Sequence, residues 1–349
     1  MEVPSIFLNR VLVEAAKKNA AYLHLTVGNP PIMRIDNQLV AMGGESIIAG
    51  ETLNKIMESF MSKDEMVEFK ENKEAVLVKD LGGNFRFRIN VFYQKNMPAM
   101  SIHHIPGVIK SLSDLGLPPA AQNFTNFNSG LLLIAGSHGS GKTTTAASFI
   151  EEVNKTSGKR VITLEDPIEN LFVGKKSIIE QRQIGRDVKS VADGLNYCLM
   201  EDVDMVYLGE IRQDLPIAMP LILELSAGNC LVILEMNVDS SIKAIEKIVN
   251  SVDTEFITEA FRYNLADALM GIIVQKLLPK HGGGMVLAAE LLLANSAVKS
   301  LIREGKVYQL ESIMQTSRRE GMISMEKSIE ELIKSGEVNQ QVISESREI

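Results

Sequence analysis

The chain has 349 residues, a formal net charge of −8 and 45 % hydrophobic residues, which is the composition of an ordinary globular protein. Its acidic balance disfavours nucleic acid as a partner, because nucleic-acid-binding surfaces are rich in Lys and Arg. The sequence predicts no membrane span, since no apolar run approaches the roughly 18 residues that a span requires. The two cysteines, Cys198 and Cys230, form no CxxC pair, which disfavours a zinc site and favours a reducing compartment.

Residues 1–107 predict a mixed α+β domain with an antiparallel sheet. Apolar residues recur at helical spacing over 6–19 and 51–71, which predicts two helices. Short runs of β-forming or alternating residues, bounded by turn residues, predict strands. These strands are expected at 24–27, 31–35, 39–41, 74–78 and 84–92.

A stretch rich in Pro, Gly and Ser separates this domain from the rest of the chain, and we expect a linker at 108–119. Residues 120–349 alternate strand and helix patterns, which is typical of an α/β fold with a largely parallel sheet covered on both faces. From about residue 294 onward the pattern is mostly helical. Strands are expected at 131–135, 160–165, 205–209, 231–235 and 285–290.

Residues 136–143 read Gly-Ser-His-Gly-Ser-Gly-Lys-Thr and match the phosphate-binding P-loop pattern G-x-x-x-x-G-K-[ST]. A buried-strand pattern precedes this loop and a helical pattern follows it, so a Gly-rich turn that binds nothing is disfavoured. Backbone N–H groups of such a loop surround nucleotide phosphates, Lys142 reaches the β- and γ-phosphates, and the Thr143 hydroxyl holds Mg²⁺. The expected nucleotide-binding residues are Gly136, Ser137, His138, Gly139, Ser140, Gly141, Lys142, Thr143 and Thr144.

Acidic residues end two of the expected strands. Glu210 follows an apolar run in the Walker B form, and we assign it to polarise the attacking water. Glu165 and Asp166 end another strand, where a solvated strand end or a helix N-cap is the alternative. Because ligands collect at the carboxyl ends of parallel strands, we expect Glu165, Glu210 and the P-loop to converge. The expected Mg²⁺ ligands are Thr143, Glu165 and Glu210, and both glutamates are assigned to catalysis.

Phosphoryl transfer also needs positive charge on the transition state, and an arginine there contributes roughly 10³–10⁵ in rate. Arg86 and Arg88 are two residues apart on an expected strand, so they share one face, while Phe85 and Phe87 occupy the other. The two arginines are therefore the candidates for this catalytic charge. Plain solvent exposure of a strand face explains the same pattern, and the residues alone leave that alternative open.

Four segments carry recognisable motifs: the arginine-bearing strand 86–92, the acidic box 163–169, the Walker B segment 208–212 and the C-terminal segment 297–304. Together with the P-loop they resemble the secretion ATPase superfamily and, within it, the type IV pilus retraction ATPases of twitching motility. The resemblance runs over nearly the whole chain. The segment 297–304, Ala-Val-Lys-Ser-Leu-Ile-Arg-Glu, is the most discriminating, because it resembles a motif characteristic of retraction motors.

The resemblance implies a PAS-like N-terminal domain at 1–107, a flexible linker, and a RecA-like ATPase domain with C-terminal helices at 120–349. It also implies a homohexamer, alone or with a paralogous ATPase. ATP and Mg²⁺ would bind between the two domains, where Arg86 and Arg88 would reach the phosphates. Hydrolysis would act on an inner-membrane pilus platform protein and so retract the pilus. The implied location is cytoplasmic, peripheral at the inner face of the cytoplasmic membrane.

The sequence departs from the family pattern at positions outside the P-loop and outside the acidic strand ends, where the family has further residues that complete the nucleotide site. Two histidines of the family's His box align with Cys230 and Asn237, and a third N-terminal arginine aligns with His103. Histidine is mostly neutral at about pH 7 and lacks the five-donor fork of arginine. Two functions therefore stay open: an ATP-hydrolysing retraction motor, and a catalytically weakened nucleotide-binding paralogue that modulates a motor.

Two other functions are disfavoured. An assembly ATPase of type II secretion usually carries a four-cysteine zinc module, and this chain has no CxxC. A RecA-like DNA translocase would present a basic surface and bind DNA in a salt-dependent way, which the acidic composition argues against.

Overall fold

The computed structural model describes residues 4–36, 38–82, 85–211, 213–251 and 255–339 of the chain. The chain divides into two compact units, Met1–Val108 and Ile109–Ile349. Each unit has its own sheet and its own hydrophobic core. Asn84, the first residue of the expected strand 84–92, and Arg212, the last residue of the Walker B segment, lie outside the described part of the chain.

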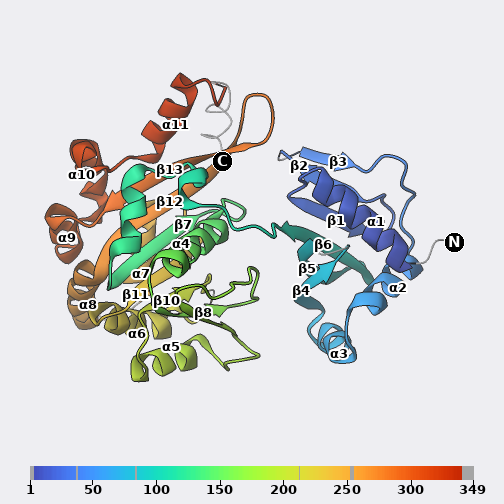
Figure 1. Ribbon diagram of the computed structural model, residues 1–349, viewed down its shortest axis with the longest axis horizontal. Coiled ribbons are helices and arrows are strands. Elements are labelled where there is room, and N and C mark those ends of the chain that lie inside the picture. The colour runs from blue at the N-terminus through green and yellow to red at the C-terminus, as the bar shows by residue number, and fades with distance from the viewer. Residues whose placement is uncertain (1–3, 37, 83–84, 212, 252–254, 340–349) are drawn as a thin grey trace. The chain divides into compact units, whose positions relative to one another are not determined.

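The first unit is an antiparallel sheet covered by helices, as predicted (Figure 1). The strand order is β3-β2-β1-β6-β5-β4, and every neighbouring pair is antiparallel. Along β5, Phe87, Ile89 and Val91 are buried and alternate with more exposed residues, so one face of the sheet meets the core. The elements are α1 (Pro4–Lys17), β1 (Tyr22–Thr26), β2 (Ile32–Ile35), β3 (Gln38–Ala41), α2 (Gly50–Phe60), α3 (Lys63–Asn72), β4 (Glu74–Leu81), β5 (Phe85–Gln94) and β6 (Met97–Ile105).

The prediction of one helix over 51–71 was wrong, because the chain breaks there into α2 and α3. Ser62 caps α3: its hydroxyl accepts from the Glu65 backbone N–H at 3.2 Å, and its own N–H donates to the Glu65 carboxylate at 2.8 Å. This reciprocal capping box satisfies two backbone donors at a new helix start. The apolar spacing continues across the break, which is why periodicity alone missed it. The strand β6 was also missed.

The second unit is a seven-stranded sheet in the order β13-β12-β7-β11-β10-β8-β9. All neighbours are parallel except β12 and β13, which form an antiparallel pair, so the largely parallel sheet is confirmed. The strands β9 and β12 were not predicted. The strands are β7 (Gly130–Gly136), β8 (Arg160–Glu165), β9 (Ile178–Gln183), β10 (Met205–Leu208), β11 (Leu231–Met236), β12 (Leu269–Pro279) and β13 (Met285–Leu293).

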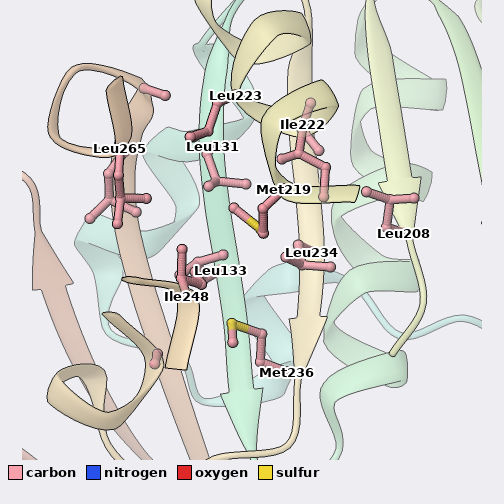
Figure 2. Close-up of a cluster of buried hydrophobic side chains, with 14 of the residues drawn as sticks. Leu131, Leu133, Leu208, Met219, Ile222, Leu223, Leu234, Met236, Ile248 and Leu265 are labelled. Atoms are coloured by element: carbon pink, nitrogen blue, oxygen red, sulfur yellow. The ribbon is translucent and has the colours of Figure 1, made fainter. Parts of the chain in front are cut away.

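Helices cover both faces of this sheet, as expected. The helices are α4 (Lys142–Thr156), α5 (Val191–Met200), α6 (Leu215–Ala227), α7 (Ser241–Val249), α8 (Glu255–Ala268), α9 (Ser296–Arg303), α10 (Leu310–Thr316) and α11 (Met325–Lys334). Leu131 and Leu133 of β7 point into a cluster with Met219 and Ile222 of α6 and Leu265 of α8 (Figure 2).

The opposite face of β7 carries the P-loop helix. Leu132 and Ile134 pack in a second cluster with Phe149 and Ile150 of α4. Because β7 is buried on both faces, all its positions are apolar or glycine, and the strand reads as a continuous hydrophobic run. This double burial holds the start of the P-loop in a fixed place.

The segment predicted as a linker, 108–119, contains residues that pack on the second unit. Leu112 and Leu117 are buried in the same cluster as Phe149 of α4, and Leu112–Leu115 forms a 3₁₀ turn. The predicted domain limits and the flexibility of this segment stay predictions. Within the described residues, no helix combines the length and the apolar character needed to cross a bilayer.

Candidate nucleotide-binding site

The P-loop joins the end of β7 to the start of α4 and has a backbone that glycine makes possible. Gly136, Gly139 and Gly141 have φ angles of 147°, 76° and 91°, in the region that favours glycine. At Gly136 a Cβ atom would lie 2.4 Å from the Ser140 hydroxyl oxygen and 2.5 Å from the Gln275 carbonyl oxygen. The loop therefore turns tightly against β12 just before the start of α4.

Lys142 is buried in this loop, with 7 % of its surface exposed. Its Nζ donates to the carbonyl oxygens of Gly136 and Ser137, each at 2.9 Å. Burial lowers the pKa of the ammonium group, while the nearby carboxylates of Glu235 and Glu210 act in the opposite direction. Glu210 is therefore close enough to Lys142 for their charges to interact.

The residues present fit a bound phosphate chain with Mg²⁺. The Ser140 hydroxyl is buried without a hydrogen-bond partner in the described structure, and no described side chain caps α4. The first N–H groups of α4 and the Lys142 ammonium are thus suited to phosphate oxygens. No three His, Cys, Asp or Glu side chains of the described residues form a metal cluster by themselves. Mg²⁺ bound to a nucleotide usually takes only one or two carboxylates, the rest of its ligands being phosphate and water.

The nine predicted nucleotide-binding residues differ in exposure. Ser137, His138, Gly139 and Thr144 are exposed, Gly141 and Thr143 are half-buried, and Gly136, Ser140 and Lys142 are buried. They run from the last residue of β7 through the loop to the first turn of α4. Their contacts with a nucleotide stay a prediction.

The parallel register aligns three strand ends at one edge of the sheet. Leu208 of β10 lies opposite Leu164 of β8 and opposite Leu234 of β11. The next residues, Glu165 on β8 and Glu235 on β11, are therefore at one level of the sheet. Glu235 in turn lies opposite Ile134 of β7, two residues before the P-loop glycine. The structure thus brings Glu165, Glu210 and the P-loop to the same carboxyl edge.

Glu165 is a buried acid and not a solvated strand end. Its side chain accepts from the Thr163 hydroxyl at 2.6 Å and from the Gln181 amide at 3.3 Å. Burial raises the pKa of the Glu165 carboxyl to about 7, against the opposing effect of these hydrogen bonds. Asp166 beside it is exposed, so the alternative of a solvated strand end applies to Asp166 and not to Glu165. The catalytic and Mg²⁺-binding roles of Glu165 and Glu210 stay predictions.

Glu235 belongs to the site and was not predicted. The Thr143 hydroxyl donates to one of its carboxylate oxygens at 3.2 Å, and the Tyr207 hydroxyl donates to the other at 2.6 Å. Burial raises the pKa of the Glu235 carboxyl to about 7. A single acid inside the otherwise apolar run 231–236 was the signal available in the sequence. Its meaning depends on β11 lying beside β7, which the sequence does not state.

Arg86 and Arg88 lie on β5 of the first unit and share the face opposite its core. Arg86 forms an ion pair with Asp80 of β4, with 3.1 Å between nitrogen and oxygen. Arg88 lies directly opposite His103 of β6, so these two side chains are neighbours on one face. The Nδ1 atom of His103 is 2.7 Å from the Ala21 carbonyl oxygen. Whether the arginines reach a phosphate stays a prediction.

The two positions aligned with the family's histidines lie at opposite ends of β11. Cys230 precedes the strand and is buried, and burial raises the pKa of its thiol to about 12, so it acts as a packing residue. Asn237 follows the strand at the carboxyl edge and is exposed. Only Asn237 is therefore on the nucleotide side of the sheet. Cys198 and Cys230 are both buried and unpaired.

A P-loop at the carboxyl edge of a parallel sheet, followed by a helix and flanked by strand-end acids, defines a RecA-like P-loop ATPase domain. The chain belongs to the type II/IV secretion system protein family, whose model matches residues 3–348.

Similar proteins cover both units of the chain. The type IV pilus retraction ATPase PilT of Pseudomonas aeruginosa is 30 % identical over 98 % of each chain. A twitching motility protein of Neisseria gonorrhoeae is 33 % identical over 88 % of this chain and 81 % of its own. The crystal structure of the pilus retraction motor PilT with bound ADP matches with a TM-score of 0.81 and 36 % identity, over 95 % of this chain and 94 % of that one.

Proposed function

We propose that this protein is an ATP-hydrolysing motor that retracts type IV pili and thereby drives twitching motility. The P-loop carries the proposal: Lys142 is buried at the carboxyl edge of a RecA-like sheet, where the charges of Glu235 and Glu210 act on it. The relatives that share this architecture are named for pilus retraction and twitching motility, and their similarity covers both units. A protein that shared only the ATPase domain with these relatives would not resemble them over the first unit.

In this mechanism the P-loop binds the phosphates of ATP. The Thr143 hydroxyl, together with Glu165 and Glu210, would help to hold Mg²⁺. Glu210 polarises the attacking water. Arg86 and Arg88 supply positive charge to the transferring phosphoryl group, which fits their shared position on the face of β5 opposite its core. Within the loop itself, the positive charge next to the phosphates comes from the Lys142 ammonium group.

The working form is a homohexamer, alone or with a paralogous ATPase, because the family resemblance implies a ring. Its direct partner is the inner-membrane platform protein of the pilus. The motor acts on the cytoplasmic side as a peripheral protein, and contact with the membrane runs through that partner. Nucleic acid has no part in this function, in keeping with the net charge of −8.

Steady-state ATP hydrolysis by the purified full chain tests the proposal. Lys142→Ala removes the buried cation that holds the phosphates, so we expect it to lose both nucleotide binding and turnover. Glu210→Gln keeps binding and lowers turnover by about 10²–10⁴-fold, the usual contribution of a group that handles the reacting proton. Lys155→Ala, on the same helix but 43 % exposed in its side chain, is the matched control and leaves both unchanged.

The result that overturns the motor is also defined. If wild-type turnover is no faster than that of Glu210→Gln while nucleotide still binds, the chain is the catalytically weakened paralogue. The replacements at His103, Cys230 and Asn237 are the sequence basis for that outcome.

A further inference from the structure

Glu235 is a costly residue to bury. It is 4 % exposed on β11, where every other strand position is apolar and also buried. Moving an ionised carboxylate out of water costs several kcal/mol, unless nearby charges and hydrogen bonds offset the loss. Its carboxylate accepts hydrogen bonds from the Tyr207 hydroxyl on β10 and the Thr143 hydroxyl on α4. The carboxylate thus joins the inner strands of the sheet to the P-loop helix.

Thr143 has a special position among these partners. A hydroxyl has one hydrogen to donate and two lone pairs to offer. The Thr143 hydrogen is directed at Glu235, which leaves the lone pairs for another group. Groups behind metal ligands generally act in this way: they accept the ligand's hydrogen, fix its orientation and increase its basicity.

We propose that Glu235 is a positioning residue for the Mg²⁺ of bound nucleotide, acting through the Thr143 hydroxyl. This inference rests on the proposed function, since it requires Mg²⁺–nucleotide at the P-loop. Tyr207 has a supporting place, because its hydroxyl holds the second carboxylate oxygen of Glu235 at 2.6 Å and so directs the first towards Thr143.

A fold-supporting role alone explains the geometry less well. The Tyr207 bond already satisfies one carboxylate oxygen between two neighbouring strands, and an apolar residue would fill the same space at lower cost. The second oxygen meets the one P-loop side chain to which the motif assigns Mg²⁺. Lys142 also lies close enough for its charge to act on Glu235, which places the acid within the site.

The test measures how strongly Mg²⁺ increases nucleotide affinity, with a fluorescent N-methylanthraniloyl-ADP titrated against the full chain in Mg²⁺ and in EDTA. The ratio of the two dissociation constants isolates the metal. For Glu235→Gln we expect this ratio to fall by about 10-fold or more, which is the usual loss when a group that hydrogen-bonds to a metal ligand is replaced. The affinity in EDTA stays within about twofold of wild type, because the phosphate contacts of Lys142 are untouched.

Two further variants keep the test decisive. Glu235→Asp retains the charge but withdraws it by one methylene, so it lowers the Mg²⁺ ratio in the same way. Tyr207→Phe removes the donor that orients Glu235 but keeps the carboxylate, so it lowers the Mg²⁺ ratio by less than Glu235→Gln does. Each variant is accepted only if its thermal unfolding is cooperative.

A double-mutant cycle separates action through Thr143 from direct binding of the metal. In a Thr143→Ala background, Glu235→Gln causes no further fall in the Mg²⁺ ratio if it acts through the hydroxyl. A further fall overturns the proposal in favour of direct ligation. Parallel losses in Mg²⁺ and EDTA overturn it in favour of a purely structural role.

The proposed function fails by a different result. If the wild-type chain binds no nucleotide, or binds it equally after Lys142→Ala, the ATPase itself is wrong. If nucleotide binds with a normal Mg²⁺ ratio that Glu235→Gln leaves unchanged, only the role of Glu235 is wrong.

Discussion

The residues at the carboxyl edge of the second sheet include two buried acids separated by one tyrosine. Glu165 on β8 and Glu235 on β11 are each 4 % exposed, and Tyr207 of β10 lies between their strands. Burial raises the pKa of each acid to about 7 and raises that of the Tyr207 hydroxyl, which stays protonated. Such groups are unfavourable for folding when ionised, so their presence at the site fits a functional use.

A pH-dependent stability follows from Glu165 in the absence of nucleotide and Mg²⁺. Its folded-state pKa of about 7 lies above the ordinary 4.5, so the folded protein holds a proton that the unfolded chain has released. The stabilisation is complete below about pH 4.5 and is lost as the pH rises through 7. The free energy of unfolding of the wild type should therefore decline as the pH rises. Because Gln is neutral at every pH, we expect Glu165→Gln to make this decline smaller by roughly 1–3 kcal/mol.

Urea unfolding at pH 5.5 and pH 8 measures the difference. Glu224→Gln, at an exposed position of α6, serves as the control and keeps the wild-type decline. An unchanged decline in Glu165→Gln would show that this carboxyl ionises normally in the folded state.

At the scale of elements, one buried acid connects three segments near the C-terminal helices. Glu290 of β13 accepts from the Ser241 backbone N–H at 2.9 Å and from the Ser241 hydroxyl at 2.5 Å, at the start of α7. Its other oxygen accepts from the Met325 N–H at the start of α11, at 3.4 Å. Negative charge at helix N-termini is favourable, because the orphan N–H groups and the helix dipole both attract it.

Replacement of this acid should therefore loosen two helices together. We expect Glu290→Ala to lower the free energy of unfolding by roughly 1–3 kcal/mol, because buried N–H groups lose their acceptor. Thermal or urea unfolding of the full chain measures the change. Glu320→Ala removes an exposed acceptor of Asn295 and should stay within about 0.5 kcal/mol of wild type. Equal effects of the two variants would contradict this account of Glu290.

For the whole molecule, the two units carry different parts of the proposed chemistry. The P-loop and the strand-end acids belong to the second unit, and Arg86 and Arg88 belong to the first. Because the family resemblance implies a ring, each subunit should turn over in contact with others. In the proposed ring, turnover would therefore depend on the assembly and not on one subunit alone.

Two measurements check the ring. Light scattering of the wild-type chain with ATP should give a mass about six times 38.4 kDa. When half of the wild-type chain is replaced by Lys142→Ala at constant total protein, ATPase activity should fall to less than half of the wild-type value, since an inactive subunit interrupts its neighbours. A monomer mass together with a strictly proportional decline would argue against a coupled hexamer.

Local patterns predicted much of this protein. The continuous apolar run of β7 and the glycines at 136, 139 and 141 indicated the P-loop, and the structure has the backbone that this pattern needs. The alternation in β5 indicated that Arg86 and Arg88 share a face. In contrast, helix spacing ran through Ser62, where a capping box starts a new helix, and the strands β9 and β12 were missed.

The sequence by itself determined the P-loop, the strand-end acids and the family, because these depend on residue types at fixed spacings along the chain. Only the tertiary structure decided that Glu165 is buried and that Glu235 meets Thr143. The two residues of that contact are separated by 92 positions, and parallel pairing of β11 with β7 brings them together. A long-range contact of this kind depends on strand order and register, which local periodicity does not encode.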